Sequence, residues 1–130
     1  MRLAKSDLQP ENDQRGAAQL MLRALARCRS GDKGTVTTLA VIARRPELYA
    51  LLRDVVTAER VASQLGARVQ WPVRRYEMPL AQTLIFVCQR AAEDTVTTSL
   101  YRDTHGKTLS SRLLDMHLEV PADLLVEAPL

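Results

Sequence analysis

The segment Thr35–Ala43, with the sequence TVTTLAVIA, constrains the fold of this chain more than any other feature. It is rich in β-branched residues and carries no charge, which favours a well-buried β-strand. After Pro46, which suits the first turn of a helix, the spacing of the apolar residues changes to steps of three and four. This apolar helical stripe consists of Leu48, Leu52, Val55, Ala58, Ala62 and Leu65. A buried strand followed by an amphipathic helical segment is therefore the centre of the predicted fold.

The rest of the chain continues the alternation of strands and helices, and the predicted order is strand–strand–helix–strand–helix–strand–helix–strand. This order predicts an α+β sandwich with a mixed or antiparallel sheet and helices packed on one face. We expect a flexible tail over residues 1–18, one domain over residues 19–121 and a second tail over residues 122–130. The further predicted elements are a strand over Leu20–Cys28, a strand around Val69–Val73, a helix over Pro79–Ala92, a strand over Thr95–Arg102, a helix over Lys107–Asp115 and a strand over Met116–Val120.

Several of these assignments leave alternatives open. Leu20–Cys28 alternates like a strand, although part of it also suits one helical face. Thr57 is able to cap a second helix within the stripe after Pro46, so two short helices or one kinked helix both fit. Pro72 withholds a hydrogen-bond donor and indicates a sheet edge or a bulge. Pro79–Ala92 is apolar nearly all round, and its length favours a helix over a strand.

Composition limits the classes of function. The chain has 130 residues, 46% of them hydrophobic, which is enough for one domain with a core. The net charge of +3 is mild, the basic residues occur as scattered short pairs, and aromatic residues make up only 4%, so we expect no nucleic-acid partner. No apolar run is long enough to span a membrane, and the N-terminal segment lacks the apolar stretch of a signal peptide. We therefore expect a cytoplasmic protein with no membrane contact.

The two cysteines, Cys28 and Cys88, are far apart in the sequence, and we interpret them as reduced buried thiols. They form no recognised zinc-binding spacing with the two histidines, so we expect neither a metal nor another cofactor.

The segment Arg29-Ser30-Gly31-Asp32-Lys33-Gly34 is the strongest candidate site. It places two cations, a carboxylate, a hydroxyl and two glycines between apolar segments. Glycines allow a tight turn whose N–H groups point at a ligand, and the cations add positive charge. This composition predicts a loop that binds phosphate or carboxylate, although a plain hairpin turn with solvated charges has a similar composition.

A second polar turn, Asp103-Thr104-His105-Gly106-Lys107, is a candidate to serve the same anion. It is not a phosphate-binding P-loop, because Tyr101 stands where that motif needs a glycine. Ser30, His105 and either Asp32 or Asp103 supply a nucleophile, a base and an orienting acid, but nothing in the sequence brings them together. The catalytic residues therefore remain unassigned.

Several strings in order resemble the AtuA-like ferredoxin-fold domain: RCRSGDKG at residues 27–34, the strand end Val41–Arg44, the helix start at Pro46, Thr57–Val61, Arg75–Pro79 and Asp103-x-x-Gly106-Lys107. The resemblance covers roughly Gln19–Pro121 and implies a ferredoxin-like sandwich. That domain occurs at the C-terminus of acyclic terpene utilisation proteins and as separate small proteins. The family has no established reaction, and a glycine-rich segment typical of it is replaced here by Ala91–Asp94.

These observations lead us to expect a non-catalytic small subunit or anion-binding module. The resemblance implies a larger AtuA-like partner of acyl-CoA or terpenoid catabolism, and the candidate loops imply an anionic ligand such as phosphate, a carboxylate or an acyl-CoA. We also expect homo-oligomers, because helices on one face leave the other face of the sheet to be covered. The alternatives are a small enzyme acting on an acyl-CoA or carboxylate, and a homo-oligomeric structural module.

Overall fold

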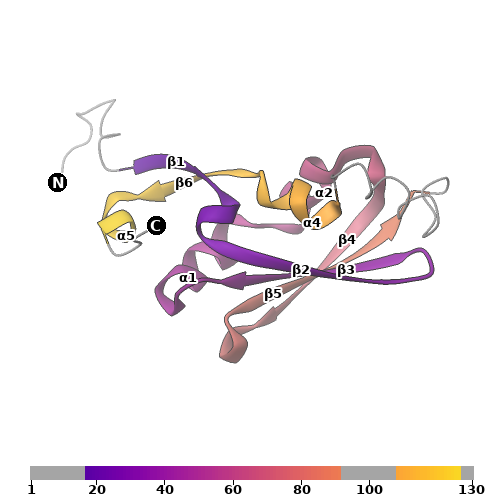
Figure 1. Cartoon of the computed structure of the whole chain (residues 1–130), viewed down its shortest axis with the longest axis horizontal. Helices are drawn as coiled ribbons and strands as arrows, with labels where there is room; N and C mark the ends of the chain where they lie inside the picture. Colours follow the sequence, from indigo (N-terminus) through magenta and orange to yellow (C-terminus); the bar gives the residue numbers. More distant parts are fainter. Residues whose placement is uncertain (1–16, 92–107, 127–130) are drawn as a thin grey trace.

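The computed structural model describes residues 17–91 and 108–126, which form two sheets and a layer of helices (Figure 1). The strands are β1 (Ala17–Met21), β2 (Ala26–Lys33), β3 (Val36–Ala43), β4 (Val69–Met78), β5 (Thr83–Arg90) and β6 (His117–Pro121). The helices are α1 (Pro46–Val55), α2 (Ala58–Leu65), α4 (Leu109–Leu114) and α5 (Ala122–Val126), with short 3-10 turns at Leu22–Ala24, Gly66–Arg68 and Pro79–Ala81. Among the described residues, regular structure is present from the first, Ala17, and includes α5 beyond residue 121.

The main sheet has four strands in the order β2-β3-β5-β4, and every neighbouring pair is antiparallel. Because β3 and β4 both run against β5, which lies between them, they are parallel to each other and are joined by α1 and α2. This split βαβ unit is the centre of a ferredoxin-like fold. The place on the other side of β3 is taken by β2, which precedes β3 in the chain. The predicted α+β ferredoxin-like architecture is confirmed.

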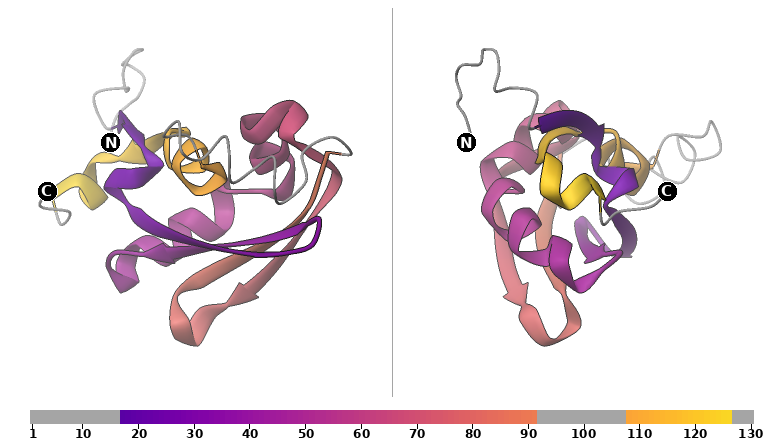
Figure 2. Two further views of the ribbon diagram at one scale, coloured as in Figure 1. Left: turned by 45° about the vertical axis from the view of Figure 1, so that its right-hand side comes forward. Right: turned by 90° about the vertical axis from the view of Figure 1, so that its left-hand side faces the viewer.

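Helices α1, α2 and α4 cover one face of the four-stranded sheet (Figure 2). α4 packs against β2, α1 against β3, and α2 against β4. The side chains that these strands send toward the helices form the core, and they include Leu39, Val41 and Phe86, each fully buried. We call this side the covered face and the opposite side the uncovered face, on which no described helix or strand packs.

The second sheet is a ribbon of β1 and β6, paired antiparallel from Ala17 opposite Pro121 to Met21 opposite His117. Figure 1 shows it at the end of the molecule that lies away from the β2–β3 turn. The single strand predicted over Leu20–Cys28 is therefore wrong. A 3-10 turn at Leu22–Ala24 divides the segment between the two sheets, and Leu22 and Leu25 fill the core at this break. Met116–Val120 is a strand as predicted.

The helical segments follow their local signals closely. Pro46 is the first residue of α1, and the stripe after it forms two helices rather than one. The Thr57 side chain accepts a hydrogen bond from the N–H of Arg60, and Gly66, at φ 62°, ends α2. The Thr108 side chain likewise caps α4 by accepting from the N–H of Ser111. These caps satisfy N–H groups that a helix leaves unpaired at its start.

The helix predicted over Pro79–Ala92 is wrong, because the segment forms a short 3-10 turn and then the central strand β5. Gln82 adopts the left-handed conformation with φ 53°, which ends the turn, and the β-branched residues that follow fit a strand. Because apolar residues lie on both faces of β5, the sequence does not show the alternation of polar and apolar residues that is typical of a strand. The predicted irregularity at Pro72 is confirmed, since β4 is an outer strand of the described sheet with a register shift between Gln70 and Arg74. The predicted strand Thr95–Arg102 lies outside the described residues.

Candidate functional site

The predicted anion loop at Arg29–Gly34 is mostly strand rather than turn. Residues as far as Lys33 belong to β2 and pair with β3, with Lys33 opposite Val36, so only Gly34 and Thr35 connect the strands. Gly34 has φ 64°, which a two-residue hairpin loop with glycine at its first position requires. Because successive side chains of a strand alternate, Arg29, Gly31 and Lys33 lie on the uncovered face, whereas Ser30 and Asp32 lie on the covered face. The six residues of the predicted loop therefore lie on the two opposite faces of the sheet and in the turn, rather than around one site.

Asp32 is held by neighbouring side chains on the covered side. Its Oδ1 accepts from Nη2 of Arg90 at 2.8 Å and from the hydroxyl of Thr37 at 2.8 Å. Arg90 is only 3% exposed and the Asp32 side chain 28%. Burial alone raises the pKa of Asp32, but the hydrogen bonds from Arg90 and Thr37, together with the charge of Arg90, outweigh it and hold the pKa below its ordinary value. Asp32 therefore ties the β2–β3 hairpin to the end of β5.

The second predicted loop and its residues Asp103, His105, Gly106 and Lys107 lie outside the described residues. Their convergence with the first loop, and a catalytic set of Ser30 with His105, stay predictions. Within residues 17–91 and 108–126, no group of three or more His, Cys, Asp or Glu side chains is placed to hold a metal ion.

The cysteines Cys28 and Cys88 are free thiols on the covered face. Burial raises the pKa of Cys28 to about 12, with a further contribution from Cys88, and burial raises the pKa of Cys88 to about 11 against an opposing effect of Arg90. Thiols with such pKa values stay protonated near neutral pH and are weak nucleophiles. The two cysteines therefore contribute to packing and are poorly suited to act as nucleophiles.

His117 is exposed at the start of β6, beside an open cavity of about 280 Å³. Arg60, Ser63, Gln64 and Met116 also line the cavity. The Arg60 guanidinium donates to the backbone carbonyl of His117 at 2.8 Å, and the Gln64 amide donates to the carbonyl of Arg112 at 2.8 Å. Two of the polar side chains that line the cavity thus connect α2 to β6 and α4, and this role is structural.

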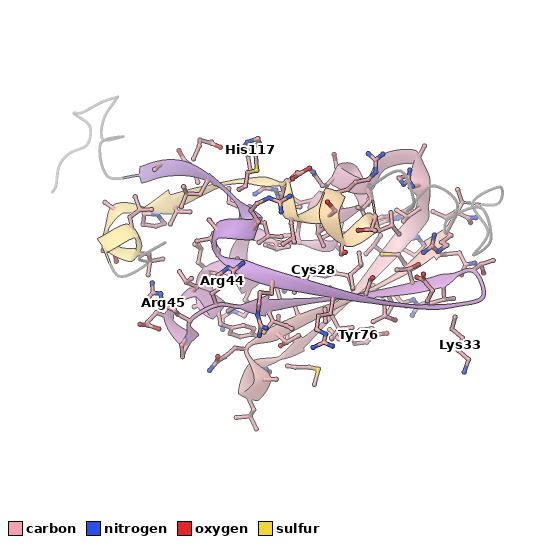
Figure 3. The ribbon with its side chains drawn as sticks, viewed as in Figure 1. Cys28, Lys33, Arg44, Arg45, Tyr76 and His117 are labelled. Atoms are coloured by element: carbon pink, nitrogen blue, oxygen red, sulfur yellow. The ribbon has the colours of Figure 1, made fainter. Side chains whose placement is uncertain are left out.

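The uncovered face is an ordered grid of side chains, because the register of the four strands aligns them in rows. Each row runs from β2 through β3 and β5 to β4. The rows are Arg27–Ile42–Thr83–Met78, Arg29–Ala40–Ile85–Tyr76, Gly31–Thr38–Val87–Arg74 and Lys33–Val36–Gln89–Gln70. The centre is apolar or β-branched and largely half-buried, and the charges lie on the two outer strands. Figure 3 shows Lys33 and Tyr76 on the side of the sheet away from Cys28.

Every charged residue of this grid is a cation: Arg27, Arg29 and Lys33 on β2, and Arg74 on β4. No described carboxylate forms an ion pair with any of them, and the carboxylates of the same strands, Asp32 and Glu77, are in register positions on the covered face. An array of unopposed cations attracts an anionic group, whether a carboxylate or a phosphate.

At the β4 side of the sheet several apolar residues are exposed; Trp71 beside Pro72 was expected to pack at an edge or interface, whereas sequence reasoning missed Tyr76, Met78 and Leu80. Trp71 is 60% exposed, Tyr76 50% and Met78 47%, and Leu80 in the β4–β5 turn is fully exposed. The alternation of Arg74, Tyr76 and Met78 on an outer strand was the available signal, since it places all three on one face. An exposed apolar group beside a cationic array is typical of an interaction surface.

The chain matches the family model of the AtuA ferredoxin-like domain over residues 20–119. It belongs to this family. The match spans both sheets and the helical layer, in agreement with the ferredoxin-like architecture. No curated protein and no solved structure matches the chain. Among the described residues, no helix is long and apolar enough to cross a membrane.

Proposed function

We propose that this AtuA ferredoxin-like chain is a non-catalytic docking subunit, and that it binds a larger protein through the uncovered face of its four-stranded sheet. The observation that carries the proposal is this face, with half-buried Ile42, Ile85 and Val87 at its centre and cations along β2. A sheet with helices on one side needs no cover on the other for its own core, so apolar side chains gathered there indicate a partner.

Among the described residues, the carboxylate and thiols considered as catalytic groups are poorly suited to that role. Asp32 is bound by Arg90 and Thr37, and the thiols of Cys28 and Cys88 have raised pKa values. A general base or nucleophile must instead reach a substrate in a concave site. These facts support a binding role over the alternative of a small acyl-CoA or carboxylate enzyme.

The partner that we propose is a larger AtuA-like protein of acyl-CoA or terpenoid catabolism. The resemblance to a domain that occurs attached to such proteins and also as separate small proteins supports this choice. The cations of the uncovered face also suit a small anion, such as phosphate or an acyl-CoA, carried at the joint between the two proteins.

The test is a titration of the full chain with a larger AtuA-like protein that lacks its own ferredoxin-like domain, followed by calorimetry. The double variant Tyr76→Asp/Met78→Asp places charge on half-exposed positions of β4 and should abolish binding. The matched control Ala50→Asp/Ala67→Asp adds the same charge at exposed positions of α1 and of the 3-10 turn after α2, and it should bind like the wild type. Thermal midpoints report whether each variant folds.

Equal binding by both double variants would contradict the proposal, as would the absence of any binding by the wild type. A wild-type dimer that the Tyr76→Asp/Met78→Asp variant dissociates would mean that a second copy covers the face. That result would support the homo-oligomer expected from the sequence and overturn the docking of a larger protein.

A further inference from the structure

We infer that the segment docking on the uncovered face is an amphipathic helix with acidic residues along one flank, oriented so that its carboxylates lie over β2 and its apolar side chains over β5 and β4. The inference rests on the proposed function, and it adds the chemistry and orientation of the partner. It follows from the charge, the width and the residue types of the grid.

The cations of the uncovered face differ from several arginines elsewhere in the described residues that pair with a carboxylate. Arg23 pairs with Asp115, Arg45 with Glu47, Arg75 with Glu77 and Arg90 with Asp32. Arg27, Arg29, Lys33 and Arg74 form no ion pair with a described carboxylate. Three of these four alternate along β2 and are interrupted only by Gly31, so the positive potential is concentrated along one outer strand. A partner that complements it carries carboxylates along a line.

The distribution of charge across the sheet sets the orientation, because three of the four cations of the face lie on β2 and one, Arg74, lies on β4. In the row Arg29–Ala40–Ile85–Tyr76, the side chains change from a guanidinium, through a small and a branched apolar group, to an aromatic ring. Three spacings between strands of about 4.8 Å give a face about 14 Å wide. A helix with its side chains is about 10–12 Å across, so one helix fills this width. Its flanks then contact β2 on one side and β4 on the other.

A second copy of the chain is a poorer occupant of this face. Stacking two uncovered faces brings together Arg27, Arg29, Lys33 and Arg74 of both copies, and no carboxylate of the face offsets them. Like charges that are brought together and desolvated oppose association. The charge of the face therefore favours a partner of different sequence.

Single-stranded RNA is also a poorer occupant. Sheets that bind RNA carry aromatic side chains on which bases stack. On the uncovered face the central strands β3 and β5 carry Val36, Thr38, Ala40, Ile42, Thr83, Ile85, Val87 and Gln89. The grid has one aromatic side chain, Tyr76, and it lies on the outer strand β4. Branched apolar side chains at the centre instead match the leucine stripe of a helix.

The experiment uses the full chain and a synthetic amphipathic peptide of about 20 residues, roughly 30 Å long as a helix. The peptide carries leucines along one stripe and glutamates along one flank, and a second peptide has lysines in place of the glutamates. Fluorescence anisotropy then measures affinity at about 0.05 M and 0.5 M salt, where the screening length falls from roughly 14 Å to 4 Å.

We expect the glutamate peptide to bind the wild type at least about tenfold more tightly than the lysine peptide, and to weaken as salt rises. Arg29→Glu should weaken the glutamate peptide by about tenfold and strengthen the lysine peptide. The matched control Arg53→Glu makes the same change of charge on the exposed side of α1 and should leave both affinities as in the wild type. Reversed preference in Arg29→Glu separates recognition of charge from a loss of fold.

Equal affinity for the two peptides, or a uridine oligonucleotide that binds more tightly than the glutamate peptide, would overturn the inference. The proposed function has a separate readout. If the larger AtuA-like protein binds and Arg29→Glu leaves its affinity unchanged, the docking function stands and the acidic helix fails. If the larger protein does not bind while the peptides behave as expected, the acidic recognition stands and the proposed partner fails.

Discussion

The two faces of the four-stranded sheet are built from the same strands and serve different purposes. On the covered face, Leu39, Val41 and Phe86 are fully buried under the helices. On the uncovered face their sequence neighbours Ala40, Ile42 and Ile85 are only half-buried. The first set removes apolar area from water and holds the domain together, whereas the second set leaves area available to a partner. Neighbouring residues of one strand thus have different roles: one stabilises the core, and the next is available for binding.

The same division separates two adjacent arginines of β4. Arg75 lies on the covered side, where its Nη1 donates to the backbone carbonyls of Arg53 at 2.6 Å and Val56 at 3.0 Å, at the end of α1. A cation at this position satisfies carbonyls that a helix leaves unpaired at its C-terminus. Arg74 faces the other way, into the cationic grid. Although the two arginines look equivalent in the sequence, Arg75 therefore stabilises the fold and Arg74 presents a charge on the surface.

The largest expected effect comes from truncating neighbouring side chains of β5. Phe86→Ala should lower the free energy of unfolding by about 3–5 kcal/mol, because it leaves a cavity in the core. Ile85→Ala should cost only about 1 kcal/mol, since its side chain is half-buried at an open face. Urea denaturation of both variants measures the difference. Similar losses in the two variants would mean that the uncovered face is part of the core.

The sequence predicted the elements correctly where neighbouring residues decide the local structure. Pro46 and Thr57 act through the backbone beside them, and the structure places Pro46 at the start of α1 and Thr57 at the cap of α2. The strand β5 was mistaken for a helix because apolar residues occupy both of its faces, which removes the alternation. β2 was mistaken for a turn beyond Cys28 because its polar residues depend on pairing with β3, which local composition does not encode.

The candidate site was predicted in part. Sequence composition located the cations Arg29 and Lys33, and the structure places both on the uncovered face. It did not show that Asp32 belongs to another environment, because its partner Arg90 is distant in the sequence. The exposed residues Tyr76 and Met78 were missed for a similar reason. Which side of β4 faces the helices depends on packing across the sheet.

A smaller effect is expected at the ion pair that anchors the hairpin on the covered side. Asp32→Asn should lower the free energy of unfolding at pH 7 by about 1.5–3 kcal/mol, because it weakens hydrogen bonds to the buried guanidinium of Arg90. The folded-state pKa of Asp32 is lowered, so its contribution is fully present above the unfolded pKa of about 3.9 and is lost as the pH falls through the folded value. Urea denaturation at pH 7 and pH 3 measures both terms.

The control for this pair is Asp54→Asn, whose partner Arg53 lies with it on the exposed surface of α1. Its effect should stay within about 0.5 kcal/mol at either pH. A loss in Asp32→Asn that does not shrink between pH 7 and pH 3 would contradict the role of the carboxylate charge.

The helical layer offers a third comparison, at the cap of α2. Thr57→Ala removes the oxygen that accepts from the N–H of Arg60 and should cost about 1 kcal/mol. Thr57→Ser keeps the oxygen and should restore most of that stability. Because the cap lies in the covering layer, neither change should alter the affinity for the acidic peptide. Thermal midpoints and anisotropy on the same samples check both statements, and a weakened affinity in Thr57→Ala alone would couple the cap to the uncovered face.

The smallest effect is expected at Lys33, the corner of the grid beside the β2–β3 turn. Lys33→Ala should change the free energy of unfolding by no more than about 0.5 kcal/mol, because the side chain is exposed and has no described ionic partner. An exposed ion pair contributes about 0.2–1 kcal/mol, so the affinity for the acidic peptide should fall by up to about fivefold. A falling thermal midpoint would make Lys33 structural. If neither midpoint nor affinity changes, the acidic flank lies over Arg27 and Arg29 only, and the docked helix stops short of the turn.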